Sequence, residues 1–188
     1  MSSLYDLHLN STPYFKINFK GGELSSDFGL LLFHKFLNQL AVPSLLDQHF
    51  TTDSNPRIYS DTFLLLQRIY QIVAGYFQED GADELAFDPI FTGFLSKERL
   101  ASQPIMSHFM NRLDEICLMQ WEGIQQQLRE KIYAYHPPKQ ILLDIDFTFF
   151  ATYGSQEGSS YNVHYQTVGY YPIFVFDGIT KDLLKAEL

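Results

Sequence analysis

The sequence predicts an α+β protein, in which an all-helical N-terminal region is followed by the first strands of a sheet. Apolar residues recur at helical steps through residue 135, and the run His136-Pro137-Pro138 then interrupts that period. Beyond the prolines the chain is rich in β-branched and aromatic residues, which favour strands. We therefore divide the chain into a mostly helical region, 1–138, and a sheet region, 139–188.

The first part of the helical region begins with an extended segment. Residues 1–22 are expected to be extended, because the stretch "YFKINFK" alternates and is followed by Gly21-Gly22, which is typical of a strand and a turn. Ser26 or Asp27 is a candidate N-cap for the apolar helix that follows. Pro43 is expected to end that helix, and only a short helix is expected after it.

The second part of the helical region contains the longest apolar pattern. Ser60 is a candidate N-cap of a helix that is apolar almost all round, so we expect this helix to lie at the centre of the region. An acidic, punctuated stretch with a break at Asp88-Pro89 follows it. After Ser102 the helical pattern resumes, as one long helix or two, with Pro104 tolerated in the first turn.

The sheet region contains three expected strands. They are "QILLDIDFTFF", "NVHYQTVGYYPIFVFDG" and "DLLKAEL", and the polar stretch between the first two is expected to be a hairpin connection. Three strands without a following helix leave one face of a sheet uncovered, which stable domains rarely do. This pattern is the first indication that the chain is a fragment.

Composition limits the possible functions. A net charge of −9 argues against a generic nucleic-acid binder, because neutralising phosphates needs clustered Lys and Arg. The single Cys117 excludes an internal disulfide, and its helical setting predicts a buried structural thiol. No apolar run is long enough to span a bilayer and no secretion signal is visible, so we expect a cytoplasmic protein without a membrane partner.

Two aspartates interrupt the first expected strand. Asp144 and Asp146 are two residues apart, so on a strand both side chains point to the same face. Carboxylates held this close repel each other unless a proton or a divalent cation lies between them, and such hard oxygen ligands suit Mg²⁺ or Mn²⁺. The alternative is an edge strand whose acids simply face water, and the spacing alone favours that alternative.

A second candidate site lies in the helical pattern after Ser102. This helix could be the second helix of a helix-turn-helix, with Gln103, Ser107 and His108 facing a groove and Arg112 near a phosphate. The alternative is an ordinary capped core helix, which is favoured because only two arginines lie nearby. The six histidines are scattered without metal-ligand spacing, so we expect surface or core roles for them.

Several of these stretches together resemble a known family. They are "SSDFGLLL", "YQIVAGYFQEDGADELAFDPIF", "LASQPIMSHFMNRLD", "ILLDIDFTFFATYGSQEG" and "YNVHYQTVGYYPIFVFDG". In this order they resemble insertion-sequence transposases of the DDE class, and among them the insertion-sequence 1380 group, whose catalytic part is the group 1 DDE transposase domain.

The resemblance implies a ribonuclease H-like catalytic core after the helical region, with the first catalytic aspartate on its first strand. In similar transposases a Thr commonly follows that aspartate two residues later, and Asp146-Phe147-Thr148 fits this pattern. We therefore expect Asp146 to be the catalytic and metal-binding acid, with Asp144 as the close second. The family's three carboxylates hold two divalent ions, which activate water or a 3′-hydroxyl for attack on a DNA phosphodiester.

The chain also departs from the family. Family members are more than twice as long, and their second Asp and final Glu lie beyond Leu188, while Asp177 is not expected to be the second catalytic acid. We therefore expect a truncated transposase that lacks cleavage. The alternative is a non-catalytic module that binds insertion-sequence ends, forms a homodimer, or pairs with full-length transposase as an inhibitor.

Overall fold

The computed structural model describes residues 7–8, 16–17, 25, 27–52, 58–154 and 156–187. By its internal contacts the chain divides into two compact units, Met1–Leu128 and Arg129–Leu188. The described helices are α1 (Leu30–Gln39), α2 (Val42–His49), α3 (Asp61–Ala74), α4 (Gly81–Glu84), α5 (Pro89–Leu95), α6 (Gln103–Met110) and α7 (Glu115–Tyr135). The described strands are β1 (Leu7–His8), β2 (Lys16–Ile17), β3 (Leu143–Phe147), β4 (Phe150–Ala151), β5 (Ser160–Asn162), β6 (Thr167–Tyr170), β7 (Ile173–Asp177) and β8 (Leu183–Glu187).

The mixed α+β class is confirmed, because these helices are followed by small antiparallel sheets. The boundary predicted at residues 138 and 139 stays a prediction. Most of the extended segment predicted for residues 1–22 lies outside the described residues. The described parts of it, β1 and β2, form an antiparallel pair. Every helix that the structure describes is too short or too polar to cross a bilayer.

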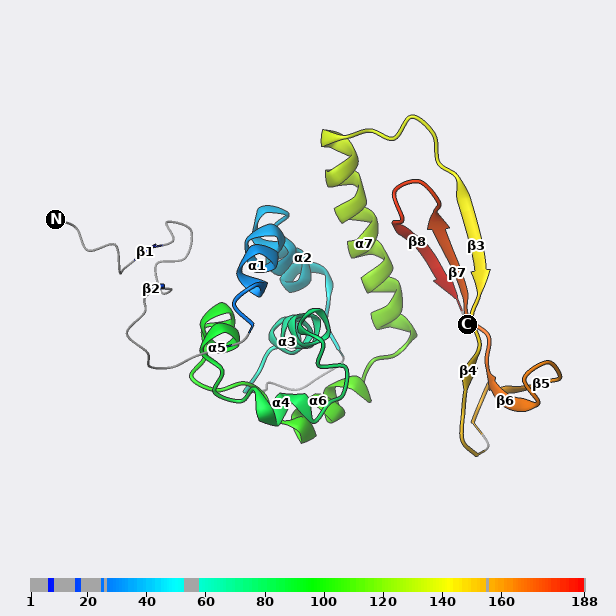
Figure 1. Ribbon diagram of the computed structural model, residues 1–188, viewed down its shortest axis with the longest axis horizontal. Helices are drawn as coiled ribbons and strands as arrows, with labels where there is room; N and C mark the ends of the chain where they lie inside the picture. The colour runs from blue at the N-terminus through cyan, green and yellow to red at the C-terminus, as the bar shows by residue number, and fades with distance from the viewer. Residues whose placement is uncertain are drawn as a thin grey trace. The chain divides into compact units, whose positions relative to one another are not determined.

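Helix α3 is the centre of the first unit, as its apolar pattern predicts. It packs against α1, α2, α5 and α6, which surround it in Figure 1. The Ser60 hydroxyl accepts a hydrogen bond from the Phe63 amide at 3.1 Å, which confirms the predicted N-cap. The helix ends at Gly75, whose φ of 95° is accessible to glycine at low cost. Leu64 and Tyr70 are almost fully buried in the core around it.

The start of α1 differs from the prediction. The N-cap position is Gly29, and no side chain caps the helix. Asp27 instead accepts a hydrogen bond from the Tyr76 hydroxyl at 3.2 Å, so its carboxylate joins two distant segments. Ser26, the other candidate, lies outside the described residues. Pro43 stands in the first turn of α2, where its missing N–H costs nothing.

The helical pattern after Ser102 forms two helices, α6 and α7. Asp114 precedes the first residue of α7, and its carboxylate caps that helix by accepting the Cys117 amide hydrogen at 2.9 Å. This hydrogen bond lowers the pKa of Asp114. Cys117 is buried, which confirms the predicted structural thiol, and burial raises its pKa.

The second unit contains two antiparallel sheets of three strands, in the orders β3–β7–β8 and β4–β6–β5 (Figure 1). The first two expected strands are therefore each divided. Pro172 separates β6 from β7, since it has no N–H to donate to a ladder, although its carbonyl accepts the Thr148 amide at 3.2 Å. The end of α7 also belongs to this unit, where Arg129 donates to the Leu183 carbonyl at 2.9 Å.

Candidate active site

The two aspartates of β3 lie on one face of the three-stranded sheet. In the register with β7, Asp144 is opposite Phe176 and Asp146 is opposite Phe174. Directly opposed residues of an antiparallel pair share a face, so both acids and both rings lie on the same side. The neighbouring apolar residues of β3 point to the other side, as the alternation of the sequence predicts.

Both carboxylates are available to a ligand. Asp144 and Asp146 are exposed, and among the described residues neither carboxylate has a hydrogen-bond or ion-pair partner. Phe174 and Phe176 are half-buried and border the acids on β7, the central strand of the sheet. The centres of their rings are 6.2 Å apart. Two unpaired carboxylates beside apolar rings supply oxygen ligands suited to Mg²⁺ or Mn²⁺. β3 is an edge strand of this sheet, so water also reaches both acids.

The third aspartate of this unit serves the fold. Asp177 is opposite Leu143, which places it on the other face of the sheet from Asp144 and Asp146. It is fully buried, and its Oδ1 accepts the Ile179 amide at 2.9 Å and the Leu142 amide at 3.4 Å. These N–H groups, chiefly that of Ile179, lower the pKa of Asp177.

The acid pair on β3 is an incomplete donor set for a two-metal centre. Throughout the described ranges, no three His, Cys, Asp or Glu side chains come close enough together to hold a metal ion. The carboxylates of β3 fit a divalent ion in their chemistry, but two-metal phosphoryl transfer needs further oxygen ligands.

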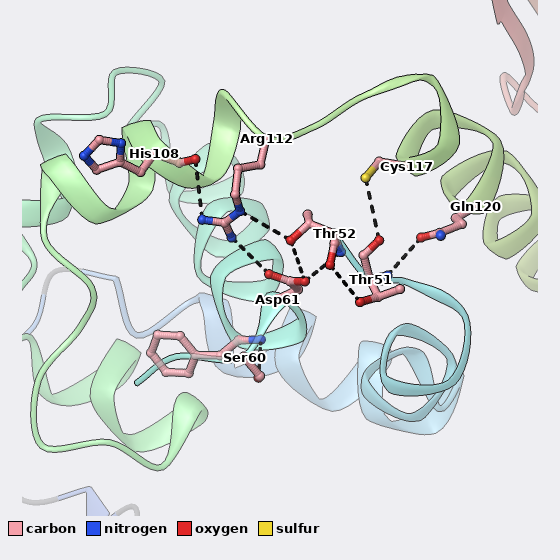
Figure 2. Close-up of polar contacts among 9 residues, drawn as sticks. Thr51, Thr52, Ser60, Asp61, His108, Arg112, Cys117 and Gln120 are labelled. Atoms are coloured by element: carbon pink, nitrogen blue, oxygen red, sulfur yellow. Dashed lines mark hydrogen bonds and ion pairs between the residues drawn. The ribbon is translucent and has the colours of Figure 1, made fainter. Parts of the chain in front are cut away.

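Arg112, which the sequence placed near a DNA phosphate, forms an internal ion pair. Figure 2 shows its guanidinium directed at Asp61, with Nη2 3.0 Å from Oδ1. Its Nε donates to the Thr52 hydroxyl at 3.3 Å, and its guanidinium carbon lies 5.4 Å from the centre of the Phe109 ring. The arginine therefore fastens the end of α6 to the first turn of α3.

The same network continues to α7 (Figure 2). Asp61 Oδ2 accepts the Thr52 amide at 2.7 Å and hydroxyl at 2.8 Å. The Thr51 amide donates to Gln120 Oε1 at 2.9 Å, and the Thr51 carbonyl accepts the Cys117 thiol at 3.7 Å. Sequence reasoning missed this network. An acid after the Ser60 cap was visible, but nothing local indicates a partner 51 residues away.

The other three predicted DNA-facing residues share helix α6 with a buried apolar face. His108 is exposed, Gln103 and Ser107 are half-buried, and Met106 and Phe109 are fully buried. The His108 ring points away from the Arg112 guanidinium in Figure 2, where only its backbone carbonyl meets that group. The outward polar face of α6 therefore consists of Gln103, Ser107 and His108. Arg112 is paired with Asp61 instead of extending this face.

The comparison with protein families identifies the class of protein. The family model described as transposase DDE domain group 1 matches residues 7–188, so the chain belongs to that family. DDE transposases typically use divalent metal ions, and membership implies DNA as the partner. Neither the curated proteins nor the solved structures contain a match to this chain.

Proposed function

We propose that this chain provides the first catalytic carboxylate of a metal-dependent enzyme that cleaves and joins DNA strands during transposition. Asp146 is the proposed catalytic and metal-binding acid, and Asp144 is its neighbour on the same site. The observation that carries the proposal is the pair of unpartnered carboxylates on one face of β3, in a chain of the DDE family.

The strand order of the second unit supports the proposed ribonuclease H-like core, and the resemblance in sequence is the ground for proposing the insertion-sequence 1380 group. The strands β3, β7 and β8 form an antiparallel sheet in this order, and the acids lie on the first of them. Thr148 follows Asp146 by two residues, as in similar transposases. The sheet holds both carboxylates in fixed relative positions, which lowers the entropic cost of assembling a metal site.

In the proposed mechanism Asp144 and Asp146 would hold a Mg²⁺ or Mn²⁺ ion. Such an ion would supply Lewis acidity, which activates water or the 3′-hydroxyl of a DNA strand for attack on a phosphodiester. The chain itself contributes the orientation of the acids and the apolar rings beside them. Because the described residues bring no third acid to this face, we propose that the chain does not cleave DNA by itself.

Metal-directed backbone cleavage tests the proposed site. Fe²⁺ bound in place of Mg²⁺ generates hydroxyl radicals with ascorbate and peroxide, and these radicals cut the backbone next to the ion. We expect cuts within β3 and the facing part of β7 that excess Mg²⁺ suppresses and that Asp146→Asn removes. Asp47→Asn, which changes an exposed acid on α2, should keep the cuts. A pattern that Asp146→Asn leaves unchanged would rule the site out.

The outward face of α6 favours a second candidate function, a non-catalytic module that binds DNA or pairs with full-length transposase as an inhibitor. Exposed His108 with half-buried Gln103 and Ser107 could contact base edges. A mobility shift of insertion-sequence ends that weakens with salt, and that His108→Ala weakens further, would support it. A shift that His108→Ala leaves unchanged would exclude this face.

A further inference from the structure

The sheet β3–β7–β8 has an open edge along β3. In the described part of the chain β3 pairs with β7 alone, so alternate residues of β3 direct their backbone N–H and C=O groups away from the sheet. The opposite edge, β8, is engaged by α7, because Arg129 donates to the Leu183 carbonyl at 2.9 Å. β8 also carries Lys185 and Glu187, whereas β3 contains no Lys or Pro. An edge without such protection is a template for a further strand.

The side chains of β3 are arranged symmetrically about Ile145. The strand reads "LDIDF", so apolar and acidic residues alternate in the same order from either end. Leu143, Ile145 and Phe147 lie on one face and are 61%, 57% and 66% exposed. Two copies of β3 that pair antiparallel about Ile145 therefore place apolar side chains opposite apolar ones. A two-fold dimer requires a surface that matches itself in this way.

The acids on the other face oppose this pairing when they are charged. In the same register Asp144 of each copy lies opposite Asp146 of the other, with Cβ atoms about 5 Å apart. Like charges directly opposite each other destabilise a sheet, and charged side chains are one means by which edge strands avoid association. Neither carboxylate has a partner among the described residues. The acids therefore keep the edge closed to a second copy while no cation neutralises them.

A divalent cation removes this repulsion. Asp144 and Asp146 of one copy are an incomplete donor set for a two-metal centre. A second copy adds the same two acids to the same face, and two carboxylates from each copy balance the charge of two divalent ions. Mg²⁺ and Mn²⁺ prefer oxygen ligands of this kind. The second copy thus contributes ligands that the site on one chain lacks.

We propose that β3 pairs with β3 of a second copy of this chain about Ile145, and that divalent cations held between their acids switch this pairing on. The inference rests on the proposed function, because the shared acids are those of the proposed metal site. It goes further in assigning a partner to that site and a regulator to the edge.

Sedimentation velocity with and without a metal ion tests the pairing. The chain should be a monomer in EDTA, and its mass should double in Mn²⁺. Ile145→Lys keeps both acids but places two lysines at the centre of the pairing, so this variant should stay a monomer in Mn²⁺. Ile116→Lys is the matched control, since Ile116 lies on α7 with a similar exposure of 58%, and it should dimerise as the unaltered chain does.

Cysteine cross-linking tests the register. Ile145 lies opposite its own copy, so Ile145→Cys should form a disulfide-linked dimer with oxidised glutathione in Mn²⁺ and none in EDTA. Leu143→Cys is the control, because Leu143 lies opposite Phe147 of the partner subunit and about 14 Å from its own copy. It should cross-link only when it is mixed with Phe147→Cys. The native Cys117 is buried, so it does not compete.

Two outcomes would overturn the inference and leave the proposed metal site standing. One is a chain that binds Mn²⁺ in calorimetry, loses this binding in Asp146→Asn, and stays a monomer throughout. The other is a dimer that forms equally in EDTA or that Ile145→Lys leaves unchanged, which would place the contact elsewhere. A folded chain that neither binds Mn²⁺ nor changes its mass would overturn the metal site and the pairing together.

Discussion

Three of the four aspartates of the sheet unit, Asp144, Asp146 and Asp177, show how much a single residue's role depends on its strand partner. Asp144 and Asp146 have no partner among the described residues, whereas Asp177 binds two backbone amides from the opposite face. The sequence places all three in strand-like segments, and the spacing of two identifies the pair that shares a face. The burial of Asp177 could not be read from the sequence, because its pairing with Leu143 spans 34 positions of chain.

The stability of the protein should depend on the charge of Asp177 in a defined pH range. The bonding lowers its pKa in the folded state below the ordinary value of 3.8, so the ionised form stabilises the fold. That contribution is complete above the ordinary pKa and is lost as the pH falls through the folded pKa. We expect Asp177→Asn to lower the Tm at pH 7, with a difference that narrows in strong acid.

Thermal unfolding followed by circular dichroism between pH 7 and pH 2.5 measures this difference. Asp144→Asn is the matched control, since its carboxylate has no partner among the described residues, and its Tm should follow that of the unaltered chain. A difference between Asp177→Asn and the unaltered chain that stays constant across this range would show that the charge is not involved.

At the scale of elements, the sequence predicted a helix end correctly where the capping residue and the amide that it binds are close together in the chain. The Ser60 cap of α3 is three residues from the amide that it accepts. The prediction that Asp27 caps α1 was wrong. Its carboxylate accepts a hydrogen bond from the hydroxyl of Tyr76, which is 49 residues away in the chain. The division between α6 and α7 stayed open in the sequence, since the apolar spacing continues through it and the capping acid, Asp114, resembles other surface acids.

Two buried glutamines of α3 offer a paired prediction. The Gln67 side chain donates to the Ala101 carbonyl at 2.9 Å and accepts the Ala101 amide at 3.0 Å. Gln67→Met would leave both buried backbone groups without partners, which should cost about 3 kcal/mol of unfolding free energy. Gln71 is equally buried, but its amide has no partner among the described residues. Gln71→Met should therefore be neutral or stabilising, within about 1 kcal/mol.

Urea unfolding of the two variants measures both free energies, and each variant is the control for the other because they lie on the same helix. Equal losses of stability from Gln67→Met and Gln71→Met would contradict the assigned hydrogen bonds.

For the whole molecule, the order of helices and then strands followed from the change of apolar period at His136-Pro137-Pro138. The sequence also identified the strand that carries the acid pair, because β-branched and aromatic runs are local signals. Two other features are long-range: the pairing of β3 with β7 and the ion pair of Arg112 with Asp61. These features depend on packing rather than on local composition, so the sequence did not contain a readable sign of them.

The central claim is that the acids of β3 bind a divalent metal ion, and calorimetric titration with Mn²⁺ and Mg²⁺ tests it most directly. We predict micromolar binding to the unaltered chain, loss of that binding in Asp146→Asn with the circular dichroism spectrum unchanged, and retention in Asp47→Asn. Equal heats from the unaltered chain and Asp146→Asn, or no binding by the folded protein, would contradict the assignment of this strand as a metal site.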